Sequence, residues 1–127
     1  MKKPNSMVWF EIYVDDMERA SRFYEHVLDV QLETLPNPTD NSLEMRSFSG
    51  DMESYGANGS LVKMEGVKAG GNNPLVYFGS EDCTTEEHRV EKAGGKVFKQ
   101  KTSIGEFGFI SLFYDTEGNM IGLHSLK

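Results

Sequence analysis

The sequence predicts an α+β protein that contains two copies of one structural module. Near the N-terminus, an apolar strand at 8–14 leads into Asp15 and Asp16 and then into a helical segment. The same order of strand, acidic turn and helix recurs at 75–95, and a short strand at 96–98 follows it. A chain of 127 residues is long enough to bury a substantial core, so we expect both copies to belong to one domain.

The first helix is indicated by its start and by its apolar spacing. Asp15 or Asp16 is expected to be the N-cap, and Glu18 stands three residues after Asp15, as in a capping box. Apolar side chains then recur every three or four residues, which is typical of a helix that packs one face on a sheet. These side chains are Met17, Ala20, Phe23, Tyr24, Val27 and Leu28.

The second helix is also framed by recognisable end signals. It is predicted to begin at Thr84, with Glu87 at the third position, and to end at Gly94. The turn-rich segment at 69–74 is predicted to link the two modules. The polar, glycine-rich segment at 50–59 is predicted to be a loop.

The strand near the C-terminus follows a tight turn of Asp, Thr, Glu, Gly and Asn at 115–119. Side chains alternate along a strand with a period of two, so Met120, Gly122 and His124 should share one face. The isoleucine and leucine between them should share the other. We therefore expect one apolar face and one face that carries the chemistry.

Three motifs, taken in order, carry a resemblance to a known family. The first is Val-Asp-Asp-Met-Glu-Arg-Ala at 14–20 with Phe-Tyr at 23–24, the second is Ala-Gly-Gly-Lys-Val at 93–97, and the third is the turn at 115–119. Their order and spacing across 7–125 resemble the glyoxalase/bleomycin resistance/dioxygenase superfamily, also called vicinal oxygen chelate proteins, in its lactoylglutathione-lyase-like branch.

The resemblance implies two βαβββ modules whose mixed sheets curl into an open cup. Module one is expected at about 7–68 and module two at about 74–126, within one glyoxalase-like domain at 1–127. It also implies a homodimer, because modules of two chains in this family often complete one another's cups.

The family further implies a divalent metal ion held by one side chain from each of four strands, usually His, Gln or Glu. By position these would be Trp9 in the first strand, Leu75 at the start of module two and Gly122 in the last strand, and none of them binds metal. The fourth position lies in the strand that ends near Glu65, where the register stays open; Glu65 would qualify and Met64 would not. We therefore expect no metal and no cofactor, with a divalent metal as the disfavoured alternative.

Alternation gives the side chains that face the cup, and they mix aromatic rings with one acid and one imidazole. Such a mixture is typical of a small-molecule pocket, and the alternative is that the rings fill the cup as core. The predicted ligand-binding residues are Trp9, Tyr13, Leu75, Tyr77 and Gly122, where Gly122 and Gly79 would leave room for a ligand.

Glu11 and His124 form the one ionisable pair that we single out for catalysis. A carboxylate can hold an imidazole in one tautomer, and histidine exchanges protons near neutral pH. The alternative is a glutamate satisfied by backbone or by a tyrosine hydroxyl, and a histidine that is partly exposed near the C-terminus.

These residues favour a metal-free protein that binds a small organic molecule with a planar ring, comparable to the drug-sequestering members of the superfamily. One alternative is a lyase, isomerase or dioxygenase that uses displaced metal ligands such as Glu11, Glu65 and His124. Others are a metal-independent acid–base enzyme, or an interaction module whose cup is vestigial, since one fold hosts many activities.

Composition excludes several partners. The net charge of −7 disfavours nucleic acid, because binding to phosphates depends on Lys and Arg. The longest apolar run, at 107–114, is too short to span a bilayer, so no membrane partner is expected. Cys83 is the single cysteine and cannot form an intramolecular disulfide, and no signal-peptide pattern is seen, so we expect a cytoplasmic protein.

Overall fold

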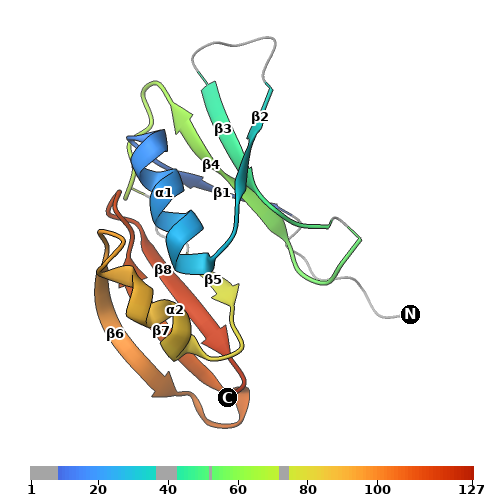
Figure 1. The fold of residues 1–127 in the computed structure, drawn as a ribbon, viewed down its shortest axis with the longest axis vertical. Coiled ribbons are helices and arrows are strands. Elements are labelled where there is room, and N and C mark those ends of the chain that lie inside the picture. The colour runs from blue at the N-terminus through green and yellow to red at the C-terminus, as the bar shows by residue number, and fades with distance from the viewer. Residues whose placement is uncertain (1–8, 37–42, 52, 72–74) are drawn as a thin grey trace.

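The computed structural model describes residues 9–36, 43–51, 53–71 and 75–127. Within them the chain forms two βαβββ modules in succession (Figure 1). Module one contains β1 (Trp9–Tyr13), α1 (Met17–Leu28), β2 (Leu32–Leu35), β3 (Leu43–Phe48) and β4 (Asn58–Met64). Module two contains β5 (Val76–Gly79), α2 (Cys83–Val90), β6 (Lys96–Ser103), the short 3-10 helix η1 (Gly105–Phe107), β7 (Phe109–Tyr114) and β8 (Met120–Ser125).

Each module builds one four-stranded mixed sheet of the same topology. The strand order is β1-β4-β3-β2 in the first sheet and β5-β8-β7-β6 in the second. The first strand of each module pairs in parallel with the last, and the remaining pairs are antiparallel. The α+β class and the repeated βαβββ module are therefore confirmed. No helix in the described part of the chain is both long and apolar enough to cross a membrane.

Helix α1 begins one residue later than a capping box requires. Asp16 is the N-cap, and its carboxylate accepts a hydrogen bond from Arg19 N at 3.0 Å. Glu18 is then the second helical residue rather than the third, so it does not reach back to the cap. Its carboxylate instead forms an ion pair with Arg46 of β3. The predicted N-cap is right at Asp16, and the predicted capping box is wrong.

Helix α2 begins before the predicted Thr84. Asp82 is the N-cap, and its carboxylate accepts from the backbone N–H of Thr84 at 3.0 Å. Glu87 serves a different purpose, because its carboxylate accepts from the backbone of Lys101 and from the hydroxyl of Ser111. The helix ends at Val90, and turns carry the chain onward to a glycine in the left-handed region at 94.

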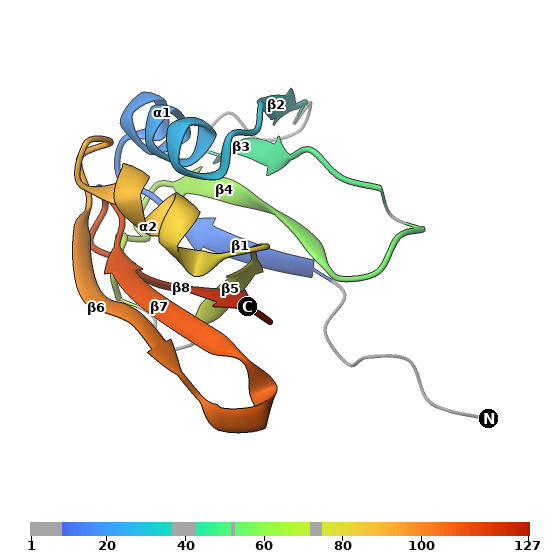
Figure 2. The ribbon, with the colours of Figure 1, turned by 60° about the horizontal axis from the view of Figure 1, so that its bottom comes forward.

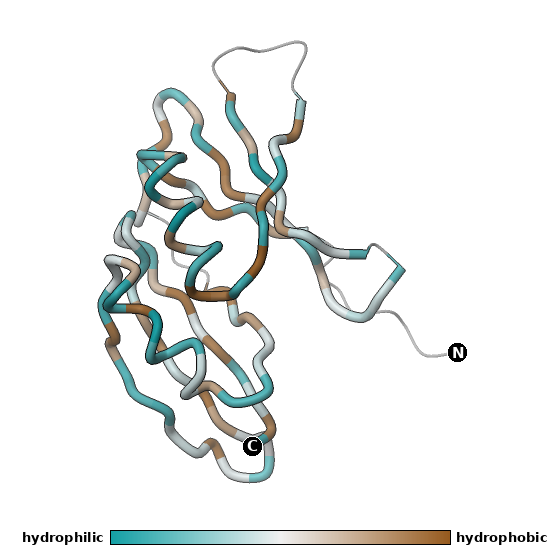
Figure 3. Tube along the Cα trace, in the orientation of Figure 1, coloured by the Kyte–Doolittle hydropathy of each residue, from teal (hydrophilic) through white to brown (hydrophobic). Residues whose placement is uncertain are grey.

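Both helices pack on one side of the strands (Figure 2). The core between the helices and the strands joins the two modules through aromatic rings. The ring centroids of Phe10 and Phe78 lie 5.7 Å apart. Those of Phe23 and Phe113 lie 5.9 Å apart. Figure 3 shows hydrophobic stretches along α1 and along the strands that it covers. The fully or almost fully buried core includes Ile12, Val14, Ala20, Tyr24, Val27, Leu61, Val90, Ile121 and Leu123.

Strands β1 and β8 show the expected alternation of side chains between the core and the opposite face of the sheet. Ile12 is 4% exposed and lies in the core, whereas Glu11 beside it is exposed on the opposite face. On β8, Ile121 and Leu123 are buried in the core, and His124 is half-buried on the other face. The concave surface that faces away from the helices is called the cup below.

The turn at 115–119 fastens module two to the start of α1. Glu117 Oε1 accepts from the backbone N–H groups of Asp15 and Asp16, each at 2.9 Å, and Oε2 accepts from Arg19 Nε at 2.7 Å. Burial acts to raise the pKa of Glu117, but the Arg19 guanidinium and the backbone donors outweigh it and lower the pKa to about 2. The carboxylate is therefore ionised and fully hydrogen-bonded between the modules.

A second set of bonds supports the same junction. The hydroxyl of Tyr24 on α1 donates to Asp115 Oδ2 at 2.6 Å, and the side-chain amide of Asn119 donates to the carbonyl oxygen of Tyr13 at 2.9 Å. Burial raises the pKa of Asp115, and the hydrogen bonds from Tyr24 and Asn119 partly offset that effect. These contacts fix β1 relative to the start of β8.

Candidate functional site

Two cavities lie at the junction of the modules. The larger, of about 820 Å³, is bordered by β1 at 10–13, by the connection at 66–71 and by the start of β8 at 119–121. The smaller, of about 590 Å³, is bordered by Tyr55 of module one and by Tyr77, Gly79, Ile104, Ile110 and His124 of module two. Cavities of this size accommodate drug-sized organic molecules.

The first strand brings together three of the sequence-predicted site residues. Trp9, Glu11 and Tyr13 alternate along β1 and share the cup face. The indole N–H of Trp9 lies 3.4 Å from Glu11 Oε2, and the hydroxyl of Tyr13 donates to Glu11 Oε1 at 3.1 Å. Partial burial, followed by this hydrogen bond and the charge of Glu11, raises the pKa of Tyr13. Glu11 therefore presents an ionisable carboxylate that two aromatic side chains hold in place.

Tyr77 and Gly122 also lie together, in a way that the sequence did not reveal. They are opposite each other on β5 and β8, and a Cβ atom on Gly122 would stand only 2.4 Å from Cδ1 of Tyr77. The ring of Tyr77 thus fills the space that Gly122 leaves. Gly79 is different, because no atom lies within 4 Å of the position of its missing Cβ. Of the two glycines expected to make room, Gly79 has the open space beside it.

Glu11 and His124, the predicted catalytic pair, lie on different sheets and border different cavities. Glu11 is on β1 and lines the larger cavity, whereas His124 is on β8, opposite Gly79, and lines the smaller one. Leu75 directly precedes β5 and is 37% exposed. The roles assigned to these residues from the sequence stay predictions.

The internal repeat sets the register of the fourth inherited metal position. The N-cap aspartates Asp16 and Asp82 follow Glu11 and Tyr77, respectively, by five residues each. The residue opposite Tyr77 on β8 is Gly122, and the residue opposite Glu11 on β4 is Ser60. Ser60 is therefore the counterpart of Gly122.

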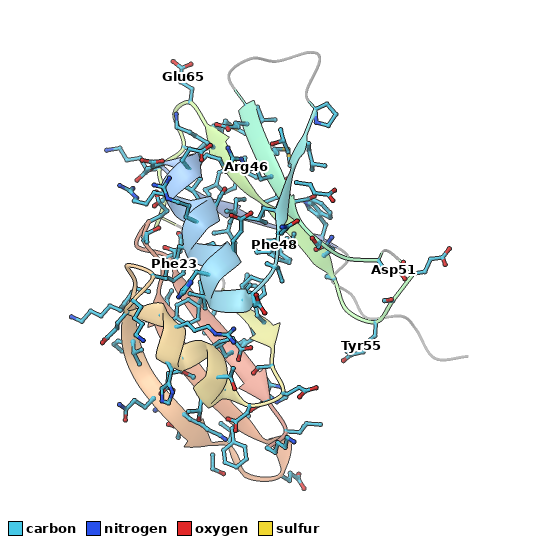
Figure 4. The ribbon with its side chains drawn as sticks, viewed as in Figure 1. Phe23, Arg46, Phe48, Asp51, Tyr55 and Glu65 are labelled. Carbon is cyan, nitrogen blue, oxygen red and sulfur yellow. The ribbon has the colours of Figure 1, made fainter. Side chains whose placement is uncertain are left out.

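Glu65, the candidate from the sequence for that position, lies beyond the end of β4. It is exposed in the turn after the strand, and Figure 4 shows its side chain directed away from the fold. The reason is that β4 pairs with β1 through 58–62, which places Ser60 rather than Glu65 opposite Glu11.

The residues present do not fit the family's metal ion. The four inherited positions are Trp9, Ser60, Leu75 and Gly122, which together offer one hydroxyl oxygen, and that hydroxyl is buried without a hydrogen-bond partner. Among the described residues, no three His, Cys, Asp or Glu side chains come close enough to hold a metal ion. The displaced set of Glu11, Glu65 and His124 is therefore not assembled, and divalent metals need such sets of ligands.

Sequence reasoning missed Tyr55 as a site residue. The segment at 50–59 was predicted to be a loop, and in the structure β4 already begins at Asn58. The loop before it carries Tyr55, which is 96% exposed (Figure 4) and borders the smaller cavity. A single large aromatic side chain within an otherwise polar, glycine-rich segment was the available signal. The connection at 66–71 likewise borders the larger cavity and contributes Val67 and Lys68.

Comparison with known proteins places this geometry in a family. The sequence model of the Glyoxalase/Bleomycin resistance protein/Dioxygenase superfamily matches residues 6–123. A glyoxylase-like domain-containing protein from Didymella fabae is 28% identical over 110 residues, which cover 86% of this chain and 84% of the relative.

Solved structures with similar folds include an enzyme and a binding protein. Glyoxalase I from Zea mays matches with a TM-score of 0.75 and 24% identity, covering 98% of this chain and 47% of the maize chain. This chain thus spans about half the length of that relative. The antibiotic-binding protein TnmS3 from Streptomyces sp. CB03234 matches with a TM-score of 0.66 and 22% identity, covering 99% of this chain and 100% of its own. The match of the family model over most of the sequence, together with the two βαβββ modules, shows that the chain belongs to the glyoxalase/bleomycin resistance protein/dioxygenase superfamily.

Proposed function

We propose that the protein binds a planar aromatic small molecule in the cup, without a metal ion. The observation that carries this proposal is the exposure of large rings on the cup face: Trp9 is 36% exposed and precedes Phe10, which lines the larger cavity, and Tyr77 is 45% exposed and lines the smaller one. Exposed apolar surface in a concavity marks a binding site more often than does a scattered surface residue.

The energetics favour a flat ligand in this position. Aromatic pairs gain about 0.5–1.5 kcal/mol beyond the burial of their area when they stack or meet edge to face. Trp9, next to the larger cavity, and Tyr77, which lines the smaller one, therefore each offer a ring-shaped ligand both apolar burial and directed contacts. The proposal of a metal-free site is supported by the described residues, in which no three His, Cys, Asp or Glu side chains come together beside these cavities.

The family comparisons support binding as the kind of activity. TnmS3 is described as an antibiotic-binding protein, and its whole chain aligns with this fold. The family resemblance also supports a homodimer, and the single cysteine favours the cytoplasm; we propose both with it. Sedimentation velocity would test the dimer, since a monomer of 14.3 kDa and its dimer are well resolved.

Trp9 provides the first test, because it is the only tryptophan in the chain and its fluorescence reports on the cup. We expect neutral tricyclic compounds such as phenazine to quench that fluorescence to saturation. By calorimetry, Trp9→Ala should weaken phenazine binding about tenfold, the loss of roughly 1.4 kcal/mol expected for one aromatic contact.

Phe98→Ala is the matched control. Phe98 is 60% exposed on β6 and packs against Tyr114, with ring centroids 5.7 Å apart, and it borders neither cavity described above. Its removal should change the affinity for phenazine by less than about twofold. Absence of saturable binding, or equal losses in the two variants, would refute the proposal.

A further inference from the structure

We infer that the preferred ligand carries a positive charge beside its ring, and that the carboxylate of Glu11 binds this charge. The inference rests on the proposed function, because it names the chemical class of molecule that the cup takes. The surroundings of Glu11, the lining of the larger cavity and the charge of the chain each support it.

Among the residues that the structure describes, no cationic side chain forms an ion pair with Glu11. Its two hydrogen-bond donors, the indole of Trp9 and the phenol of Tyr13, are neutral groups. Within the described ranges, the ion pairs closer than 4.0 Å involve Arg19, Arg46 and Lys101 with other carboxylates, and none involves Glu11. Glu11 is also exposed, so a ligand can reach it.

The same two donors orient the carboxylate for a ligand. Trp9 is bound to one oxygen of Glu11 and Tyr13 to the other, which holds the carboxylate between two rings. Each carboxylate oxygen can accept more than one hydrogen bond, so capacity for a charged N–H donor is left on both. A cation near the face of tryptophan or tyrosine gains a further electrostatic attraction from the ring.

The larger cavity otherwise presents a largely apolar wall. Besides Glu11 and Tyr13 it is bordered by Val67, Val76 and Met120, and Asn119 adds a polar amide. Lys68 also borders it, but Lys68 is exposed and lies beyond ion-pair distance of Glu11. One negative charge in an apolar wall complements a flat molecule with one cationic group.

The net negative charge of the whole chain also favours a cationic ligand. A net charge of −7 attracts cations and repels anions at a distance, and salt screens this effect. Long-range attraction alone would respond equally to the loss of any carboxylate. A specific role for Glu11 must therefore be separated from the general charge.

Three tricyclic probes and three variants make that separation. Proflavine is a cation at neutral pH, phenazine is neutral and anthraquinone-2-sulfonate is an anion. We expect wild type to bind proflavine at least about tenfold more tightly than phenazine, since hydrogen bonds to charged groups are stronger than those between neutral groups. Glu11→Gln should remove that preference, so that proflavine and phenazine bind with similar affinities.

Glu65→Gln is the matched control, because it makes the same chemical change in an exposed turn beyond β4. It should leave all three affinities within about twofold. Thermal unfolding of Glu11→Gln and Glu65→Gln checks that both variants fold. Glu11→Asp keeps the charge and should therefore keep a preference for proflavine over phenazine.

The outcomes distinguish the inference from the proposed function. If phenazine binds but Glu11→Gln does not weaken proflavine, or weakens it no more than Glu65→Gln, the inference is wrong and the metal-free binding site stands. Tightest binding of the anion would also overturn it. If no probe binds saturably, the proposed function itself fails, and the inference fails with it.

Discussion

Glu117 shows how much a single carboxylate can contribute to this fold. Its side chain is fully buried and accepts hydrogen bonds from two backbone N–H groups before α1, and it forms an ion pair with Arg19, 98 positions away in the sequence. A buried charge is stabilising only when its partners satisfy it, and here they all come from the other module or the adjacent Thr116.

We predict that Glu117→Gln lowers the free energy of unfolding by about 2–4 kcal/mol at neutral pH, because an amide cannot accept from all these donors and loses the charge that pairs with Arg19. Urea unfolding measures the change. Glu65→Gln is the control and should stay within about 0.5 kcal/mol of wild type. Equal stabilities of the two variants would contradict the role given to Glu117.

Wild type and Glu117→Gln also test how the free energy of unfolding depends on pH in acid. The folded-state pKa of about 2 lies below the ordinary value of 4.5, so Glu117 adds stability that is fully present above pH 4.5 and is lost as the pH falls toward 2. Wild type should lose free energy of unfolding in this range more steeply than Glu117→Gln. Asp115, whose pKa is raised, is present in both proteins and does not alter the comparison.

The sequence predicted which residues of one strand share the cup face. It did not predict which residues lie opposite one another on two paired strands. Trp9, Glu11 and Tyr13 share a face because alternation within β1 is a local property. Ser60 could not be identified, because its place opposite Glu11 is set by a pairing 49 residues distant in the sequence. The filling of the space at Gly122 by Tyr77 escaped prediction for the same reason.

At the scale of elements, the positions of the strands and helices followed from the sequence better than their ends did. The start of α2 was misplaced at Thr84 because Asp, Thr and Glu are all acceptable near a helix N-terminus, and Asp82 is the one whose carboxylate reaches the backbone. Strand β6 extends to Ser103 rather than 98, because its polar second half pairs with β7 and needs no apolar pattern to do so.

The adjacent strands β5 and β8 offer a matched pair of glycines. We predict that Gly122→Ala forces the ring of Tyr77 to move, since the new Cβ would lie 2.4 Å from Cδ1, and lowers the free energy of unfolding by about 1–3 kcal/mol. Gly79→Ala adds the same methyl group where no atom lies within 4 Å, and should stay within about 0.5 kcal/mol. Urea unfolding compares them, and similar losses would show that Tyr77 does not occupy the space over Gly122.

At the scale of the whole molecule, the two modules repeat each other in topology but not in their connections. The turn between β7 and β8, at 115–119, is short and bonds to the start of α1. The corresponding connection between β3 and β4, at 49–57, is longer and carries Tyr55 to the border of the smaller cavity. One connection therefore fastens the modules together, and the other contributes to the cup.

Because the contacts at Glu117 and between Phe10 and Phe78 cross from one module to the other, the chain should work as two complementary fragments. Residues 1–71 and 75–127, co-expressed as separate polypeptides, are expected to reassemble and co-elute in size-exclusion chromatography. A fragment carrying Glu117→Gln should associate more weakly. Failure of the unaltered fragments to associate would show that the covalent linker is needed, whereas reassembly would make each module a separable half of a two-part sensor for whatever fills the cup.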